Sequence, residues 1–174
     1  MGSVTLITGG VRSGKSACAI ARASEGPAAS RRFVIATGQG LDDEMRARIA
    51  LHRKTRPADF ETVEEPIALG SVLTALETRA DIVVLDCLTL WVSNLLGRGL
   101  SDSAILAEAD SLVSALKSTS FITVIVSDEV GWGIVPDNQL ARRFRDLLGW
   151  TNQKVAAVAD SVLLMVAGCQ IRVK

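Results

Sequence analysis

The chain has 174 residues, 48% of them hydrophobic, and its 19 Lys and Arg residues balance its 19 Asp and Glu residues. This length fits a single domain over residues 1–174, and the balanced charge argues against a nucleic-acid partner bound by bulk electrostatics. No apolar stretch is long enough for a membrane span, and three scattered cysteines (Cys18, Cys87 and Cys169) are expected to be buried thiols, so we expect a cytoplasmic protein.

The first elements are a strand, a glycine-rich loop and a helix. Val4–Thr8 is apolar and β-rich, and Ser16–Ala23 is helix-forming. Between them Gly9–Ser16 fits the pattern G-x-x-x-x-G-K-[ST] at every fixed position. In such a loop the backbone N–H groups turn toward an anion, Lys15 reaches the β- and γ-phosphates of a nucleotide, and the Ser16 hydroxyl can hold Mg²⁺. The segment therefore predicts nucleotide binding.

Strands and helices alternate along the rest of the chain. The expected strands are Arg32–Thr37, Phe60–Glu64, Asp81–Asp86, Phe121–Val126, Ser161–Val166 and Gln170–Val173. The expected helices are Asp42 to about Thr55, Ile67 to about Leu76, Leu88–Leu96, Asp102 to about Lys117 and Asp137 to about Ala159. The last two strands are so close in sequence that they must be antiparallel. The pattern predicts an α/β fold like that of P-loop NTPases: a mainly parallel sheet flanked by helices, with a C-terminal antiparallel hairpin.

Polar residues follow three of the apolar strands, namely Thr37, Asp86 and Ser127–Glu129. Ligands of such sheets bind at the carboxyl ends of the strands, where these residues would meet the phosphate loop. Four apolar residues precede Asp86, as in a Walker B carboxylate that orders Mg²⁺ directly or through water. The alternative is that Asp86 caps the following helix.

His52 is the only histidine, and Arg53, Lys54 and Arg56 follow it. This group is either a solvated helix end, where cations favour the C-terminal dipole, or a clamp on phosphates. In the second case a neutral imidazole held among cations can attack phosphorus.

A second basic group, Arg142, Arg143 and Arg145, is either a solvated face or an anion site. Trp132 lies between two glycines and is expected to be exposed, whereas Trp91 and Trp150 are expected to pack inside.

Several segments together resemble one enzyme family. They are Thr8–Ser16, Ile35–Thr37, Asp42–Met45, Arg48–Ile49 with His52–Arg53 and Arg56–Pro57, Leu85–Trp91, Asp128–Pro136, and Asn138 with Leu140–Arg142. In this order and spacing, from about Thr5 to the C-terminus, they resemble the bifunctional adenosylcobinamide kinase/adenosylcobinamide-phosphate guanylyltransferase of cobalamin biosynthesis. Only the phosphate loop is shared widely; the segments around His52 and Asp128–Pro136 are specific to this family.

The resemblance implies two reactions. ATP or GTP first phosphorylates the hydroxyl of adenosylcobinamide, a corrinoid small molecule. GTP then gives GMP to an enzyme histidine with release of pyrophosphate, and adenosylcobinamide phosphate takes the GMP to form adenosylcobinamide-GDP. The reactive histidine of the family falls on His52, and Lys15 would balance phosphate charge in both reactions. Some members form a homotrimer, and the resemblance extends that expectation to this chain.

The resemblance also implies which residues contact the nucleotide and the metal ion. The Mg²⁺ ligands would be Ser16 and Asp86. The nucleotide-binding positions would be Gly9, Gly10, Val11, Arg12, Ser13, Gly14, Lys15, Ser16, Ala36, Thr37, Gly38, Arg53, Lys54, Thr55, Arg56, Glu64 and Asp86. Three positions depart from the family pattern: Phe60 replaces a tryptophan, Leu51 replaces a second histidine, and Asp128 stands where Asn is frequent.

Three other functions fit parts of the sequence. A monofunctional P-loop kinase of a small metabolite would leave His52 structural and form no covalent nucleotide. A regulatory GTP-binding switch would need an Asn-Lys-x-Asp stretch to read guanine, and Asn152–Val155 is not one. A non-catalytic nucleotide-binding subunit would not need acids at Glu64 and Asp86.

Overall fold

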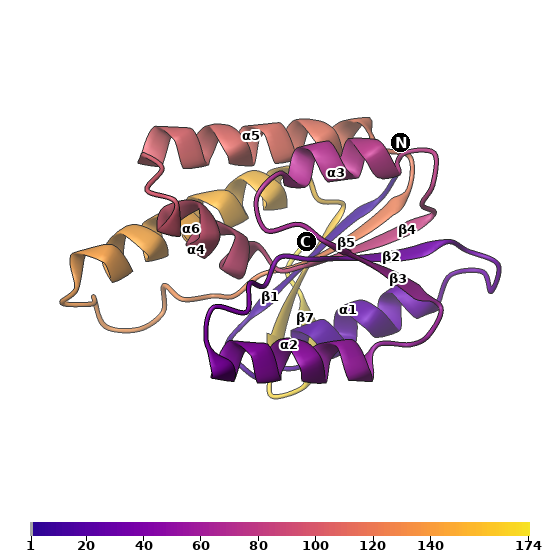
Figure 1. The fold of residues 1–174 in the computed structure, drawn as a ribbon, viewed down its shortest axis with the longest axis horizontal. Coiled ribbons are helices and arrows are strands. Elements are labelled where there is room, and N and C mark those ends of the chain that lie inside the picture. The colour runs from indigo at the N-terminus through magenta and orange to yellow at the C-terminus, as the bar shows by residue number, and fades with distance from the viewer. Residues whose placement is uncertain (1) are drawn as a thin grey trace.

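A seven-stranded sheet with the order β3-β2-β4-β5-β1-β6-β7 forms the centre of the molecule, in a computed structural model that describes residues 2–174 (Figure 1). All neighbouring strands are parallel except β6 and β7. The strands are β1 (Val4–Gly9), β2 (Arg32–Ala36), β3 (Phe60–Glu64), β4 (Ile82–Asp86), β5 (Ile122–Val126), β6 (Ser161–Val166) and β7 (Cys169–Arg172). The predicted mainly parallel sheet and C-terminal hairpin are confirmed.

Helices cover both faces of the sheet (Figure 1). The helices are α1 (Lys15–Ser24), α2 (Asp43–Thr55), α3 (Leu69–Leu76), α4 (Leu88–Gly97), α5 (Asp102–Ser118) and α6 (Gln139–Val158). Helices α3 to α6 lie on one face and pack on one another, and α1 and α2 lie on the other face. Two layers of helices explain why the central strands are apolar at consecutive positions rather than at alternate ones.

The core is accordingly divided by the sheet into two clusters. Leu6 and Leu85 face the larger cluster, which α3 to α6 complete. Ile7, which follows Leu6, and Val84, which precedes Leu85, face the smaller cluster beneath α1. Successive strand residues point to opposite faces, so one apolar run serves both clusters.

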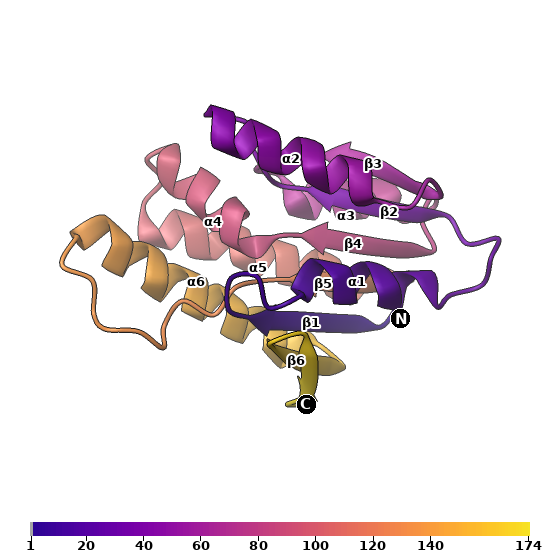
Figure 2. The same cartoon turned by 90° about the horizontal axis from the view of Figure 1, so that it is seen from below.

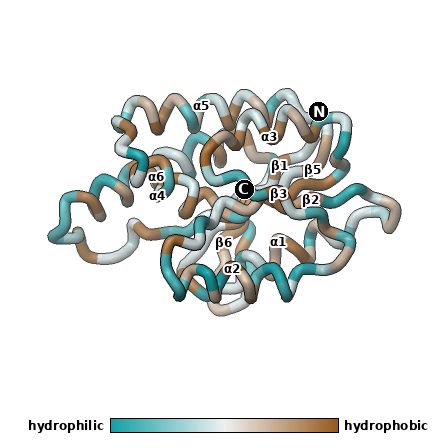
Figure 3. Tube along the Cα trace, viewed as in Figure 1, coloured by the Kyte–Doolittle hydropathy of each residue, from teal (hydrophilic) through white to brown (hydrophobic). Residues whose placement is uncertain are grey.

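Helix α2 differs from the other helices because none of its residues is buried, and it is mostly hydrophilic (Figure 3). Its start is well defined: the Asp42 side chain accepts a hydrogen bond from the backbone N–H of Met45 at 2.7 Å. Asp43 and Glu44 follow in the first turn, where negative charge favours the helix dipole. The N-cap hydrogen bond and the acidic first turn therefore stabilise α2, and one face of the helix lies toward the site described below.

Some local predictions were wrong. Helix α3 begins at Leu69, two residues late, because the carbonyl of Ile67 accepts the Trp91 indole N–H at 2.7 Å and Glu65 Oε1 accepts the N–H groups of Ile67 and Ala68. Trp91 is buried as expected, but Trp150 is 46% exposed.

Of the cysteines only Cys87 is buried; Cys18 is half-buried and Cys169 exposed, and all three are unpaired thiols. Within residues 2–174 no helix is long and apolar enough to cross a membrane.

Candidate active site

The phosphate loop joins β1 to α1 at the carboxyl end of the sheet. Gly9 has φ 145° and Gly14, the N-cap of α1, has φ 97°, values that residues with a Cβ rarely adopt. The first turn of α1 therefore directs its free N–H groups toward the loop, which suits an anion. Lys15 Nζ donates to the Gly10 carbonyl at 2.6 Å and forms an ion pair with Asp128 Oδ1, also at 2.6 Å. The lysine is thereby held inside the loop.

Two side-chain oxygens that could bind a cation meet between α1 and β4. The Ser16 hydroxyl donates to Asp86 Oδ1 at 3.3 Å, which joins α1 to the end of β4. Mg²⁺ prefers oxygen ligands, usually one or two from the protein with water and phosphate oxygens completing the shell, so this pair fits it. Among residues 2–174 no group of three or more His, Cys, Asp or Glu side chains could hold a metal ion. Water and phosphate oxygens would therefore have to complete the coordination shell.

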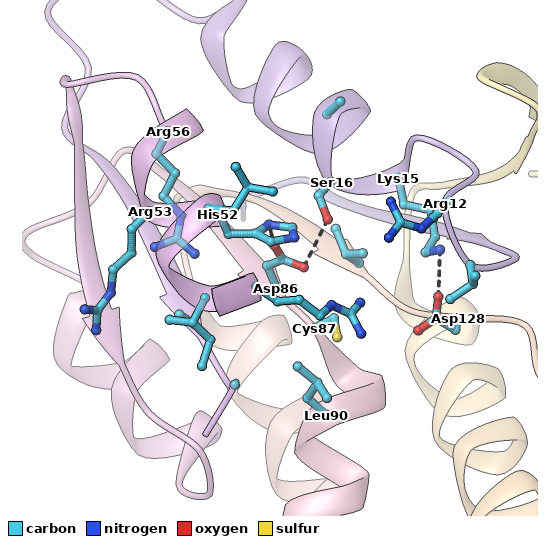
Figure 4. A pocket seen from close by; sticks show the side chains of 18 of the residues that line it. Arg12, Lys15, Ser16, His52, Arg53, Arg56, Asp86, Cys87, Leu90 and Asp128 are labelled. Carbon is cyan, nitrogen blue, oxygen red and sulfur yellow. Dashed lines mark hydrogen bonds and ion pairs between the residues drawn. The ribbon is translucent and has the colours of Figure 1, made fainter. Parts of the chain in front are cut away.

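His52 reaches the same place from the last turn of α2. Its Nδ1 lies 3.9 Å from Asp86 Oδ2, and about half of its side chain is exposed to the cavity and solvent (Figure 4). Burial raises the pKa of the Asp86 carboxyl, and the nearby His52 and Arg56 act in the opposite direction. Asp86 thus faces both the imidazole and the Ser16 hydroxyl.

Two arginines of the basic group extend along the cavity wall. Arg56 Nη1 donates to the Thr62 hydroxyl at 3.0 Å, and burial lowers the pKa of its guanidinium group, which stays charged at neutral pH. Arg53 forms an ion pair with Glu64 at the end of β3. Both arginines therefore connect the C-terminal end of α2 to β3, and both line the cavity described next.

These side chains surround one cavity of about 460 Å³, within the size range of small-molecule sites. The expected site residues that line it are Val11, Arg12, Ser13, Gly14, Lys15, Ser16, Ala36, Gly38, His52, Arg53, Arg56, Glu64 and Asp86. Five others do not line it: Gly9, Gly10, Thr37, Lys54 and Thr55.

Thr37 has a structural contact instead. Its buried hydroxyl donates to the Cys87 carbonyl at 2.7 Å and accepts from the Cys87 N–H at 2.9 Å, which fixes the backbone just after Asp86.

Comparison with known proteins identifies the family of this chain. The model of the cobinamide kinase/cobinamide phosphate guanyltransferase family matches residues 5–173. The chain belongs to this family. It is therefore an enzyme of the kinase and guanylyltransferase type, with nucleotides among its substrates.

Three relatives of the family match nearly the whole chain. The bifunctional adenosylcobalamin biosynthesis protein CobU of Salmonella typhimurium is 41% identical over 181 residues, covering 97% of this chain and 98% of the relative. The protein of the same name from Escherichia coli has the same identity and coverage. The bifunctional adenosylcobalamin biosynthesis protein CobP of Pseudomonas aeruginosa is 40% identical over 171 residues, covering 97% of this chain and 96% of the relative.

Some residues that line the cavity were not among the expected site residues. Met45, Arg48 and Ile49 line the cavity with His52 because they share one face of α2. Their spacing from the histidine (seven, four and three residues) is the signal that could have found them. Asp128, expected at this edge of the sheet but given no site role, also lines the cavity.

Two arginines of the second basic group contact parts of the chain away from the cavity. Arg142 donates to the carbonyls of Pro136 and Asp137, and Arg143 pairs with Asp102 at the start of α5. None of the three arginines of this group lines the cavity. The structure therefore favours the interpretation of Arg142, Arg143 and Arg145 as structural and surface residues over that of an anion site.

Proposed function

We propose that this protein phosphorylates the hydroxyl of adenosylcobinamide with ATP or GTP and then transfers GMP from GTP, through a covalent GMP–His52, to adenosylcobinamide phosphate. The products of the second reaction are adenosylcobinamide-GDP and pyrophosphate. One observation carries the proposal: the only histidine of the chain lines the same cavity as the phosphate loop. A kinase alone would not need a nucleophile there.

In the first reaction, the hydroxyl oxygen of the corrinoid bonds to the γ-phosphorus as the bond between that phosphorus and its bridging oxygen breaks. The hydroxyl loses its proton, which is released to solvent. The loop N–H groups and Lys15 would bind the phosphates and stabilise charge on the leaving nucleoside diphosphate. Lys15 can do so because its Nζ already lies within the loop, 2.6 Å from the Gly10 carbonyl.

In the second reaction, an imidazole nitrogen of His52 bonds to the α-phosphorus of GTP, and the α–β phosphoanhydride bond breaks to release pyrophosphate. Because Nδ1 faces Asp86, we assign the attack to Nε2. A phosphate oxygen of adenosylcobinamide phosphate then bonds to the same phosphorus and the N–P bond breaks. The covalent intermediate divides one difficult exchange into two displacements.

The neighbouring cations support this assignment. Arg48, Arg53 and Arg56 line the cavity on the His52 side. These positive charges would attract the phosphates of GTP to the side of the cavity where His52 lies.

A bound Mg²⁺ would neutralise phosphate charge in both reactions, and Ser16 and Asp86 would hold it. The support is the 3.3 Å contact between their oxygens. The measurement is GTP affinity by calorimetry with Mg²⁺ and after chelation, in the wild type and in Ser16→Ala. We expect chelation to weaken GTP binding at least tenfold in the wild type and to have a smaller effect in the variant.

The function is tested by incubating the protein with Mg²⁺ and GTP labelled at the α-phosphate, followed by denaturation. We expect acid-labile label on the wild type and on the control variant Glu44→Gln, an exposed α2 position outside the cavity. His52→Ala should retain no label but should still phosphorylate cobinamide. If the wild type stays unlabelled while it phosphorylates a corrinoid or another alcohol, it is a monofunctional kinase.

Two further proposals concern assembly and location. Homotrimeric assembly is supported by the resemblance to members that form trimers, and sedimentation should then give three times the chain mass of 18.4 kDa. A cytoplasmic location is supported by the three unpaired cysteines.

A further inference from the structure

The loop between β5 and α6, residues 127–138, is fixed at both ends. At its start the Glu129 N–H donates to the Gly9 carbonyl at 3.1 Å and Glu129 Oε1 accepts from the Thr8 hydroxyl at 2.8 Å. At its end Arg142 Nη1 donates to the carbonyls of Pro136 and Asp137 at 2.8 and 2.6 Å. These hydrogen bonds therefore fix the position of both ends of the segment between them.

That segment exposes large apolar side chains. Trp132 is 74% exposed, Ile134 96% and Val135 59%. A loop that only connects two elements is usually polar, and an exposed tryptophan beside two aliphatic side chains marks a binding surface more often than a structural one. We call Trp132, Ile134 and Val135 the apolar loop surface.

This surface lies next to the cavity but outside it. Asp128, at the start of the loop, lines the cavity and pairs with Lys15, whereas none of the residues 129–138 lines it. Figure 2 shows the loop (orange) projecting from the end of the sheet where the phosphate loop also lies. A molecule on the apolar loop surface would therefore be beside the nucleotide phosphates without taking their place.

We propose that the apolar loop surface binds the corrin ring of cobinamide, while the arm that carries the reacting hydroxyl enters the cavity. This inference rests on the proposed function and names the part of the chain that holds its second substrate. A nucleotide fills most of a cavity of about 460 Å³, so the wide corrin macrocycle must bind outside it. The methyl groups on the rim of the macrocycle suit exposed tryptophan and aliphatic side chains.

A corrinoid fits this surface better than a second copy of the chain does. Stable protein interfaces bury about 800 Å² on each partner, so these three side chains do not by themselves make the interface of the proposed homotrimer. A macrocycle needs only a small platform, and an arm tethered to it would find the phosphate loop at high effective concentration. The same bound ring would present its arm to the phosphate loop and then to His52, because both line one cavity.

The test compares Trp132→Ala and Ile134→Ser with Trp150→Ala, a control that removes another half-exposed tryptophan, on α6. Cobinamide binding is measured by equilibrium dialysis, and phosphorylation kinetics are measured with saturating ATP. We expect the two loop variants to bind cobinamide roughly tenfold more weakly, with KM raised and kcat changed less, as for loss of a substrate platform. Trp150→Ala should match the wild type.

Two results would overturn the inference. One is wild-type cobinamide affinity in both loop variants. The other is a change of molecular mass in solution without a change of affinity, which would make the surface a self-association interface. Labelling of the wild type with α-labelled GTP needs no corrinoid, so it tests the proposed function separately from this surface.

Discussion

The ammonium group of Lys15 and the carboxylate of Asp128 lie 2.6 Å apart, and the pair joins the residues that follow two adjacent parallel strands, β1 and β5. Lys15 is almost completely buried, and Asp128 is mostly so. The lysine that should bind nucleotide phosphates is therefore paired with an internal anion. Incoming phosphates must compete with this carboxylate and are also repelled by it.

Asp128→Asn should consequently bind GTP several-fold more tightly than the wild type, because the competing negative charge is lost. The same change should lower the free energy of unfolding without nucleotide by about 1–3 kcal/mol, since a buried cation loses its partner. Calorimetric titration with GTP and urea unfolding measure the two effects. Weaker GTP binding in the variant would contradict this and show that the Asp128 carboxylate itself assists binding.

The glycines of the phosphate loop should differ sharply in their tolerance of a methyl group. At Gly9, with φ 145°, an added Cβ would overlap the Met165 carbonyl oxygen. Gly10 has no positive φ, and its Cβ would meet nothing within 4 Å. We expect Gly9→Ala to lose about 1–3 kcal/mol of unfolding free energy and Gly10→Ala to lose little.

Thermal and urea unfolding of the two glycine variants check this difference, with Gly10→Ala as the matched control one residue away. Equal destabilisation of both would mean that the loop relaxes around a Cβ at either position. In that case the backbone conformation at Gly9 would not be what requires glycine there.

Much of the fold follows from local sequence signals. The alternation of apolar strands with capped helices predicts the parallel sheet, and β3 (Phe60–Glu64) and β6 (Ser161–Val166) have the predicted bounds. The tight turn at Ala167 and Gly168, both with positive φ, explains the antiparallel hairpin. These features depend on neighbours in sequence, which is why sequence alone predicts them.

Features that depend on distant contacts were predicted less well. The late start of α3 depends on Trp91, 24 residues beyond Ile67. Thr37 looks like a cavity residue at a strand end, but its hydroxyl bonds to the backbone of Cys87. The exposure of Trp150 depends on which face of α6 meets α4 and α5, which the hydrophobic pattern of that helix alone does not determine.

A surface ion pair at the opposite end of the sheet should make stability depend on acid pH. Asp81 accepts hydrogen bonds from the backbone N–H and guanidinium of Arg31, which lowers the pKa of its carboxyl to about 2 from 3.8. A lowered carboxyl pKa adds stability above the ordinary aspartate range, and this contribution disappears as pH falls through about 2.

Asp81→Asn should therefore lower the Tm slightly at pH 7, because exposed pairs stabilise little, and the difference from the wild type should vanish near pH 2. Thermal scans of both proteins between these pH values measure it. A difference in Tm that stays constant over this range would show that the Asp81 charge does not act through the Arg31 pair.

The three thiols should react at very different rates in the folded protein. Burial, and then the nearby Asp86 carboxylate, raise the pKa of the Cys87 thiol to about 12, whereas Cys169 is exposed on β7. The thiolate is the reactive form, and the raised pKa keeps the Cys87 thiol almost entirely protonated at pH 8. Iodoacetamide at pH 8 should therefore label Cys169 first, half-buried Cys18 more slowly, and Cys87 only after unfolding in urea, as peptide mass spectrometry would show. Labelling of Cys87 in the folded protein as fast as that of Cys169 would contradict this prediction. It would mean that the reagent reaches a reactive Cys87 thiolate through the cavity, which Cys87 lines.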